Sequence, residues 1–285
     1  MASVQDLATP CNPNFCPGCG DFGIWSAFKK AAVESGWDSS NTAMIAGVGC
    51  HGHILNFVKI ASFGSLHGRA YPVGEGVKMA NHDLNVFVFT GDGDSLAEGG
   101  NHFMHACRRN HDINIMLHDN AIYGLTTGQT SPRSPHGFVT KSTPEGNLDE
   151  PLNVVAVAIA AGATFVARAY AGDIPKVAEL MKQAVAHKGI SILDILQPCV
   201  TFNKLYTHQF YQDNAYWLDE KYDPTNKAAA FAKALEWGEK AIAMGVFYKE
   251  EKPSYEQQIP ALAAGAQASK PVEKRDIAEL YRKYT

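Results

Sequence analysis

Four of the six cysteines in this chain stand at positions expected of metal ligands. Cys16 and Cys19 have the C-x2-C spacing of a metal-binding pair. Cys50 and Cys199 each closely follow an apolar run with the character of a buried strand. In a soluble chain this pattern favours an iron–sulfur cluster over a disulfide framework. The sequence therefore predicts redox chemistry at a site that these four thiolates share.

A second set of residues has the types that bind a divalent cation and a diphosphate. In the GDGD turn, Gly91 and Gly93 let the backbone approach a phosphate, and Asp92 offers a carboxylate to Mg²⁺. Asn120 can add an amide oxygen and Ile122 a backbone carbonyl. A GDG turn alone is more often an ordinary acidic turn before a helix. The Asp-Asn pair after the next apolar run makes a magnesium–diphosphate site the better interpretation.

The composition argues against several classes of protein. The 285 residues are 46% hydrophobic, which suffices for one large or two small α/β domains. A formal net charge of −4 offers no basic surface for nucleic acid. The first residues show no signal peptide, and the most apolar stretch, 154–167, is too short to span a bilayer. We expect no membrane partner and a cytoplasmic location, where cysteines stay reduced.

Hydrophobic patterning predicts alternating strands and helices. The strand candidates are continuous apolar runs, as expected for a sheet covered on both faces. They are Ala43–Gly47, Asn85–Thr90, Ile113–His118, Thr164–Arg168 and Ser191–Leu196. The helical patterns are Phe22–Ser35, Gly74–Asn81, Ser95–Asn110, Leu152–Ala161 and Asp173–His187. This order predicts an α/β fold with a doubly wound, mainly parallel sheet.

Two of these helices begin with capping signals. Ser95 and Glu98 have the spacing of a capping box, in which each side chain bonds a backbone N–H of the other's residue. Asp173 is a predicted N-cap, followed by Pro175 in the first turn.

The candidate ligands follow successive predicted strands. Cys50 comes after the first strand, Asp92 after the second, Asn120 after the third and Cys199 after the fifth. Ligands of open parallel sheets bind outside the carboxyl ends of the strands. Random placement would scatter these residues over both edges, so we expect one composite site.

Two segments interrupt the alternation. Residues 124–151 form a long stretch rich in Gly, Thr, Ser and Pro, and loops of this length are usually functional or disordered. From residue 201 the chain is rich in aromatic residues and then has a helical pattern over 226–244. We expect residues 1–200 to form the α/β domain that carries the site. Residues 201–285 are expected to form an extension that wraps over this domain or over a partner subunit.

The motifs in combination resemble one known family. GDGD, followed about 25 residues later by DN-x-x-YGLT-x-GQ, is similar to the thiamine diphosphate motif of 2-oxoacid:ferredoxin oxidoreductases, in their beta subunit. CPGCG, GVGCHGH, the LHGR segment at 66–69 and QPC match the same family in the same order. The resemblance covers roughly residues 12–250, and the combination of motifs is highly specific.

The resemblance implies thiamine diphosphate, Mg²⁺ and one [4Fe–4S] cluster as cofactors. The Mg²⁺ ligands that it implies are Asp92, Asn120 and the carbonyl of Ile122. The cluster ligands that it implies are Cys16, Cys19, Cys50 and Cys199. The residues expected to line the thiamine diphosphate site are Gly49, Cys50, His51, His67, Gly93 and Asp94.

Three candidate catalytic residues also come from the resemblance. His67 is expected to hydrogen-bond the cofactor. Arg69 is expected to bind an acyl carboxylate or a phosphate of coenzyme A, although a surface arginine at a helix start is the plain alternative. Thr127 stands where many relatives carry lysine, at a position expected to contact coenzyme A or a substrate carboxylate. This departure leaves the identity of the 2-oxoacid open.

The cysteine spacing permits another assignment. Cys11, Cys16 and Cys19 have C-x4-C-x2-C spacing with Cys50 following, which resembles the plant-type [2Fe–2S] pattern. We favour Cys199 over Cys11 as the fourth ligand because Cys199 lies on the predicted ligand-binding edge and because the family has it there. Cys11 is then a spare, partly exposed thiol.

Two further metal assignments compete with a cluster. Zinc would accept the same four thiolates in a tetrahedral site, but it provides no route for electrons. His51 and His53 next to Cys50 would suit a mixed Cys/His metal site. We favour instead a hydrogen bond from His51 to the cofactor and a structural role for His53.

The resemblance finally implies partners and a reaction. Thiamine activation needs a carboxylate at the aminopyrimidine ring, and we expect Glu98 to cap its own helix instead. In the family that carboxylate comes from an alpha, or fused gamma-alpha, subunit, so we expect an obligate heteromer. The implied reaction converts a 2-oxoacid such as pyruvate or 2-oxoglutarate, with coenzyme A, into acyl-CoA and CO2 and reduces ferredoxin. The alternative is a non-oxidative thiamine diphosphate enzyme whose cysteines bind nothing.

Overall fold

An eight-stranded sheet organises the chain. The computed structural model describes residues 3–271 and 277–284, and its strands follow the order β2-β1-β3-β4-β6-β5-β8-β7. Neighbouring strands are parallel except β5 and β8, which are antiparallel. The predicted α/β fold with a mainly parallel sheet is confirmed. The strands are β1 (Thr42–Ala46), β2 (Ala61–Gly64), β3 (Asn85–Gly91), β4 (Asn114–Asp119), β5 (Phe165–Tyr170), β6 (Ser191–Leu196), β7 (Ala215–Trp217) and β8 (Ile242–Lys249).

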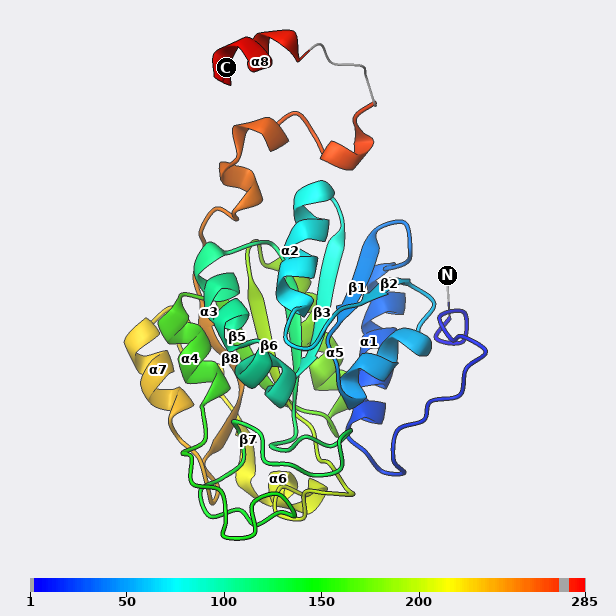
Figure 1. The fold of residues 1–285 in the computed structure, drawn as a ribbon. Coiled ribbons are helices and arrows are strands. Elements are labelled where there is room, and N and C mark those ends of the chain that lie inside the picture. The colour runs from blue at the N-terminus through cyan, green and yellow to red at the C-terminus, as the bar shows by residue number, and fades with distance from the viewer. Residues whose placement is uncertain (1–2, 272–276, 285) are drawn as a thin grey trace.

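Helices cover both faces of this sheet (Figure 1). Helices α1 and α5 pack together on one face, and α2, α3, α4 and α7 lie on the other. The α-helices are α1 (Asp21–Ser35), α2 (Ala70–Ala80), α3 (Gly100–Arg109), α4 (Val154–Ala161), α5 (Ile174–Ala186), α6 (His208–Asn214), α7 (Lys227–Ala234) and α8 (Ala278–Tyr284). The shorter helical turns are η1 (Cys50–Asn56), η2 (Asp94–Glu98), η3 (Glu256–Gln258), η4 (Pro260–Leu262) and η5 (Gln267–Ser269).

Strand β3 has apolar side chains on both faces of the sheet, so helices must cover both faces. Successive side chains of a strand point to opposite faces of the sheet. Phe87 and Phe89 accordingly join the core under α1 and α5, whereas Val86 and Val88 join the core under α2, α3 and α4. All four side chains are fully buried, so the strand reads as a continuous apolar run. Two hydrophobic cores thus hold β3 rigidly at the centre of the sheet.

The C-terminal part differs from the sequence prediction. The helix expected over residues 226–244 is wrong: α7 ends at Ala234, and β8 then pairs with β5 in the main sheet. Gly245 lies within β8 at φ 122°, a conformation that a helix does not contain. The sheet therefore continues beyond residue 200, and the division of the chain into two domains at that residue stays a prediction.

The two predicted helix caps have different outcomes. The Asp173 cap is confirmed, because its side chain accepts a hydrogen bond from the backbone N–H of Lys176. The capping box of Ser95 and Glu98 is wrong. The Ser95 hydroxyl instead pairs with the buried hydroxyl of Tyr71, and η2 is a single π-helical turn that precedes α3.

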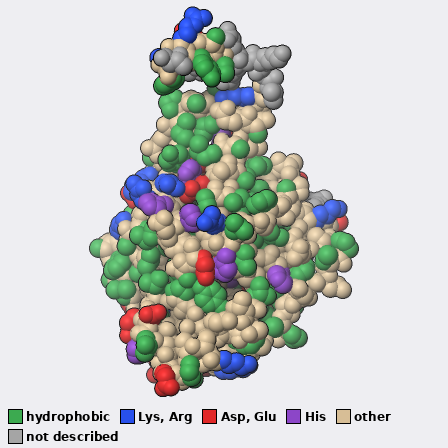
Figure 2. All heavy atoms as spheres, in the orientation of Figure 1, with side chains coloured by type: hydrophobic (Ala, Val, Ile, Leu, Met, Phe, Trp, Pro, Cys, Tyr) green, Lys and Arg blue, Asp and Glu red, His purple; other side chains and the backbone are tan. Residues whose placement is uncertain are grey.

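The long loop after β4 is packed rather than loose. The side-chain amide of Asn147 donates to the carbonyls of Ser134, Pro135 and Asp149, which joins the middle of the loop to its C-terminal part. At the opposite edge of the sheet, the turns η3 to η5 extend away from the main body (Figure 1). On the face of the molecule seen in Figure 2, hydrophobic side chains are interspersed with charged ones. Among the described helices, none combines the length and apolar character needed to cross a bilayer.

Candidate active site

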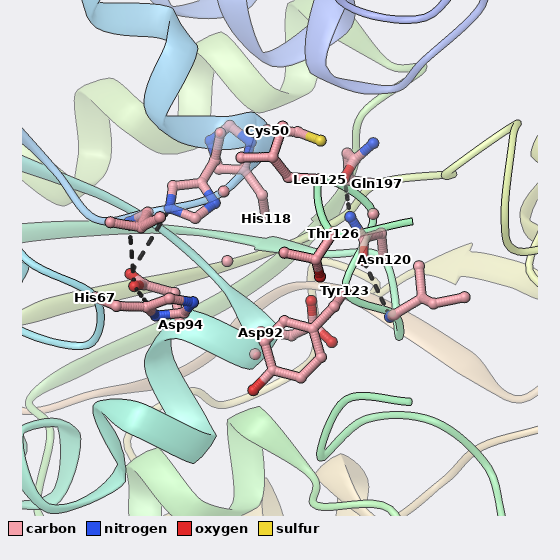
Figure 3. A pocket seen from close by; sticks show the side chains of 17 residues that line it. Cys50, His67, Asp92, Asp94, His118, Asn120, Tyr123, Leu125, Thr126 and Gln197 are labelled. Atoms are coloured by element: carbon pink, nitrogen blue, oxygen red, sulfur yellow. Dashed lines mark hydrogen bonds and ion pairs between the residues drawn. The ribbon is translucent and has the colours of Figure 1, made fainter. Parts of the chain in front are cut away.

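A cavity lies at the carboxyl edge of the sheet, where β1, β3 and β4 end. Every residue predicted to line the thiamine diphosphate site or bind Mg²⁺ contributes to its wall (Figure 3). These residues are Gly49, Cys50, His51, His67, Asp92, Gly93, Asp94, Asn120 and Ile122. The parallel strands bring them together because their carboxyl ends meet at one edge.

Asp92 occupies an environment that fits a bound divalent cation. Its carboxylate is 2% exposed and accepts a hydrogen bond from the Ser131 hydroxyl. Burial raises the pKa of Asp92 well above its ordinary value, and the neighbouring Asp119 carboxylate raises it further. A nearby cation would stabilise the ionised form of such a group.

The side chain of Asn120 is held in one orientation. Its Oδ1 accepts a hydrogen bond of 3.0 Å from the backbone N–H of Ile122, and its Nδ2 donates to Gln197 Oε1 at 2.9 Å. An amide oxygen has two lone pairs, so Oδ1 can still bind a cation. Asp92 and Asn120 follow neighbouring parallel strands and line the same cavity, as a shared Mg²⁺ site requires.

Asp94 organises the loops around the cavity. Its Oδ1 accepts hydrogen bonds from the backbone N–H groups of Gly68 at 2.7 Å and Val48 at 3.2 Å. Its Oδ2 accepts from the Thr90 hydroxyl at 2.7 Å. His67 Nδ1 lies 2.8 Å from Oδ1. Asp94 therefore joins the turn after β1, the loop before α2 and the end of β3.

The neighbours of Asp94 explain its ionisation and its close packing. Burial acts to raise its pKa, but the adjacent His51 ring, whose Nε2 lies 3.7 Å from Oδ2, and the backbone N–H of Gly68 outweigh this effect and lower the pKa to about 2. A Cβ at Gly47 would lie 1.8 Å from Asp94 Oδ2, so only glycine fits there. The first glycine of the GVGC segment, Gly47, is therefore required for the Asp94 carboxylate to occupy this position.

The side chain of Glu98 contacts residues that line the cavity and does not cap its own helix. Tyr123 OH donates to Glu98 Oε2 at 3.0 Å, and His67 Nδ1 lies 3.5 Å from the same oxygen. The expectation that Glu98 caps its helix is therefore wrong. The tight approach of Tyr123 also explains Gly93, since a Cβ at that glycine would lie 2.3 Å from the tyrosine ring.

The two other candidate catalytic residues lie elsewhere. Arg69 is exposed and lines a separate hollow with Phe63 and Leu66. Thr127 is exposed and lines a neighbouring cavity; its φ of 74° is unusual for a β-branched residue. Their roles stay predictions.

Side chains of the long loop after β4 form hydrogen bonds with residues at the ends of β3 and β4, beside the cavity. Ser131 bonds Asp92, and Arg133 Nε donates to Asp119 Oδ2 at 2.7 Å. Ser134 donates to the Ala121 carbonyl at 2.7 Å. This loop therefore fixes the ends of β3 and β4.

A second cavity contains the four cysteines. Cys16, Cys19, Cys50 and Cys199 all line this space of about 220 Å³. A Cβ at Gly124 would lie 3.4 Å from the sulfur of Cys199 and 3.6 Å from that of Cys50, so this glycine leaves both sulfurs uncovered. Cys11 and Cys16 are both exposed, but Cys16 lines this cavity and Cys11 does not.

The four cysteines line one cavity but do not converge on a single point. Within residues 3–271 and 277–284, no three Cys, His, Asp or Glu side chains converge to hold a single metal ion. Burial, with a contribution from Asp21, raises the pKa of Cys19 and raises that of Cys50 to about 12. Such thiols become thiolates only with positive charge nearby, which a bound metal ion or cluster would supply.

The two cavities share a wall. The residues that line both are Cys50, Asn120, Gly124, Leu125 and Gln197. A group held in one cavity would therefore lie next to a group held in the other.

Sequence reasoning missed His118 and Gln197. His118 lines the first cavity, and its Nδ1 lies 2.6 Å from Asp21 Oδ1. Burial lowers the pKa of His118, although Asp21 opposes this effect. His118 directly precedes the DN motif at 119–120, and Gln197 is the first residue of the QPC motif; these positions were the available signal.

Comparisons with known proteins agree with this geometry. Residues 47–195 match the family model for the C-terminal TPP binding domain of thiamine pyrophosphate enzymes. Residues 199–264 match the model for the C-terminal part of the pyruvate ferredoxin oxidoreductase beta subunit. The first match covers just over half of the chain, so the fold and the site define a thiamine diphosphate-binding enzyme domain.

Individual relatives identify a more specific family within the thiamine diphosphate-binding enzymes. A 2-oxoacid:ferredoxin oxidoreductase subunit beta of Sulfolobus sp is 44% identical over 267 residues, covering 89% of this chain and 87% of the relative. The 2-oxoglutarate oxidoreductase subunit KorB of Mycobacterium tuberculosis is 44% identical over 199 residues, covering 70% and 53%. The solved 2-oxoglutarate:ferredoxin oxidoreductase from Magnetococcus marinus superposes with a TM-score of 0.92 at 35% identity, covering 100% and 96%. The chain belongs to the family of 2-oxoacid:ferredoxin oxidoreductase beta subunits.

Proposed function

We propose that this chain is the catalytic beta subunit of a CoA-acylating 2-oxoacid:ferredoxin oxidoreductase. In the proposed reaction a 2-oxoacid, pyruvate or 2-oxoglutarate, reacts with coenzyme A to give acyl-CoA and CO2. Two electrons leave one at a time through a [4Fe–4S] cluster to ferredoxin. Family membership supports the reaction class, and the shared wall between the two cavities supports the electron path.

The first cavity supplies the groups that thiamine diphosphate and Mg²⁺ require. Asp92, Asn120 and the carbonyl of Ile122 would coordinate Mg²⁺, and Gly93 would let the backbone approach the diphosphate. When bound, thiamine diphosphate supplies the nucleophile and electron sink for removing CO2 from a 2-oxoacid. His51 lines this cavity, and its Nε2 has no hydrogen-bond partner within the part of the chain that the structure describes. It is therefore available to a bound cofactor.

The second cavity is proposed to hold the cluster. Cys16, Cys19, Cys50 and Cys199 would be its ligands, in preference to a plant-type set that includes Cys11. The single observation that carries the proposal is that one wall of this cavity is also a wall of the other. Electrons released in the first cavity would therefore reach an acceptor directly behind Cys50.

An alpha subunit is proposed to complete the site. Glu98 is hydrogen-bonded to Tyr123, so a carboxylate for the aminopyrimidine ring would come from another chain. Leu125 lines both cavities and is 45% exposed, which suits burial against a partner. The solved Magnetococcus marinus enzyme has 2-oxoglutarate, coenzyme A and succinyl-CoA bound, and we propose corresponding ligands here. A cytoplasmic location would keep the thiols reduced.

The proposal is tested on the alpha–beta complex purified without oxygen. Iron, sulfide and thiamine are assayed, and ferredoxin reduction is followed with pyruvate or 2-oxoglutarate, with and without coenzyme A. We expect about four iron atoms per beta chain and reduction that depends on both substrates. A colourless protein that decarboxylates a 2-oxoacid without reducing ferredoxin would show the non-oxidative alternative instead.

A further inference from the structure

The side chain of Gln197 lines both cavities. Figure 3 shows it beside Asn120 in the wall of the first cavity. Gln197 is 1% exposed and follows directly on the end of β6. Its Oε1 accepts a hydrogen bond from Asn120 Nδ2 at 2.9 Å, and its Nε2 donates to the sulfur of Cys19 at 3.1 Å. One amide therefore contacts a proposed Mg²⁺ ligand with one end and a proposed cluster ligand with the other.

The direction of these hydrogen bonds is fixed by the backbone. The N–H of Ile122 can only donate, so the oxygen that it meets at 3.0 Å is Asn120 Oδ1. Asn120 Nδ2 then faces Gln197, which must present Oε1 to it. Gln197 Nε2 consequently faces Cys19 and also donates to the Pro198 carbonyl at 3.1 Å. Reversing the amide would oppose two donors at Asn120 and two oxygens at Pro198.

The surroundings prevent Gln197 from moving away. Its backbone N–H donates to the Asp119 carbonyl at 2.8 Å, continuing the pairing of β4 with β6. On the other side, Gly20 packs so closely that a Cβ there would lie 2.9 Å from Gln197 Cγ. A buried, enclosed amide of this kind keeps its rotamer only while its hydrogen bonds remain satisfied.

We infer that Gln197 is a positioning residue that couples the two cofactor sites. Its Oε1 holds the Asn120 amide in the orientation that presents Oδ1 to Mg²⁺, and its Nε2 stabilises negative charge on the Cys19 sulfur. The inference rests on the proposed function, because it requires a cluster at Cys19 and Mg²⁺ at Asn120. One side chain would therefore influence both the affinity of the first cavity for Mg²⁺ and the reduction potential of the cluster in the second.

The sign of each effect follows from simple electrostatics. Reducing a cluster adds negative charge to its sulfur ligands, so an N–H donor at Cys19 stabilises the reduced state and raises the reduction potential. Losing Oε1 leaves the buried Asn120 Nδ2 without its acceptor, which costs about one hydrogen bond and weakens Mg²⁺ binding about fivefold. A residue with only a packing role would move neither quantity in this pattern.

The test compares Gln197→Met with wild type in the intact alpha–beta complex. Met is similar in length but neither donates nor accepts a strong hydrogen bond. An anaerobic redox titration followed by electron paramagnetic resonance gives the cluster potential. Thiamine diphosphate binding at increasing Mg²⁺ gives the half-saturating Mg²⁺ concentration. We expect a more negative potential and a half-saturating concentration about fivefold higher.

Asp21→Asn is the matched control. Asp21 Oδ2 lies 3.4 Å from the same Cys19 sulfur, so removing its charge should make the potential more positive. We expect the half-saturating Mg²⁺ concentration to stay within about twofold of wild type, because the side-chain hydrogen bonds of Asp21 in the described part of the chain go to Cys19 and His118, neither of which is a proposed Mg²⁺ ligand. The two variants should therefore move the potential in opposite directions, and only Gln197→Met should weaken Mg²⁺ binding.

Gln197→Glu gives the same decision if Gln197→Met assembles poorly. It keeps an acceptor for Asn120, loses the N–H donor at Cys19 and adds negative charge there, so the potential should fall while Mg²⁺ binding should not weaken. An unchanged potential or an unchanged Mg²⁺ response in Gln197→Met, with iron content equal to wild type, would overturn the inference. Wild-type protein without iron, or without Mg²⁺-dependent thiamine diphosphate binding, would instead refute the proposed function.

Discussion

Two clusters of buried polar side chains at opposite edges of the central sheet differ in their hydrogen bonding. At the amino edge, Asn110, Thr164 and His187 bond one another: the Thr164 hydroxyl lies 2.7 Å from both Asn110 Oδ1 and His187 Nε2. At the carboxyl edge, the Nε2 atoms of His51 and His118 lack hydrogen-bond partners among the described residues. Both histidines line the cavity proposed to bind thiamine diphosphate.

This difference separates stability from ligand binding within one sheet. A buried polar group without a partner is unfavourable for folding, so its persistence at a cavity points to a ligand. A fully bonded network gives a ligand nothing to contact, and its value is structural. Substitutions at the carboxyl edge should therefore impair binding, and substitutions at the amino edge should impair folding.

The largest expected effect is loss of cofactor binding in Asp92→Ala. Loss of a residue that only supports a metal ligand typically lowers metal affinity about 10- to 100-fold. Removing the proposed ligand itself should therefore weaken Mg²⁺-dependent thiamine diphosphate binding more than about 100-fold. Calorimetric titration of the alpha–beta complex measures this affinity.

The same variant should unfold at nearly the wild-type denaturant concentration, because losing an unfavourably buried carboxylate offsets the lost hydrogen bond from Ser131. Asp83→Ala is the control, since that side chain is 73% exposed. If Asp92→Ala bound the cofactor normally but unfolded easily, the comparison between the edges would fail.

Asn110→Ala should have the reverse profile. Asn110 ends α3 at φ 61°, where asparagine is tolerated better than alanine, and its Oδ1 also accepts from the backbone N–H of Ile190 at 3.0 Å. We expect a loss of about 2 kcal/mol in the free energy of unfolding, measured by urea titration. Thiamine diphosphate affinity of the folded protein should not change, and a large loss of affinity would contradict the structural role.

A smaller effect is expected from pH at the amino edge. Burial, assisted by Lys249, lowers the pKa of His187 to about 4, below its value of about 6.5 in an unfolded chain. The neutral ring is favoured in the folded state, so its contribution is complete above about pH 6.5 and declines as the pH falls towards about 4. Relative to His187→Gln, the wild type should lose about 1 kcal/mol of unfolding free energy between about pH 7 and 4.5. Parallel pH dependences of the two proteins would show that His187 is not the titrating group.

The central strands could be predicted from the sequence because their burial leaves a local signature. The predicted strand Ser191–Leu196 has the bounds of β6, and the turns after β1, β3, β4 and β6 carry the expected ligands. Local sequence suffices there, since a continuous apolar run ending in Gly, Asp or Asn encodes both a buried strand and its functional end.

Features that depend on distant partners could not be predicted. Strand β8 pairs with β5, and its IAMGVFYK segment offered no clear preference between strand and helix. The role of Gln197 depends on Cys19, which lies 178 residues earlier in the chain. Glu98 follows its predicted helix start but bonds Tyr123 from the next strand's turn. Such contacts arise only after the sheet has assembled.

The iron content of two cysteine variants tests the central claim most directly. That claim is that Cys199, and not Cys11, completes a cluster site that shares a wall with the cofactor cavity. Anaerobically purified wild type and Cys11→Ser should each contain about four iron atoms per beta chain, and Cys199→Ser should lose them while still binding thiamine diphosphate. About two iron atoms, retained in Cys199→Ser and lost in Cys11→Ser, would contradict the claim and establish the plant-type site instead.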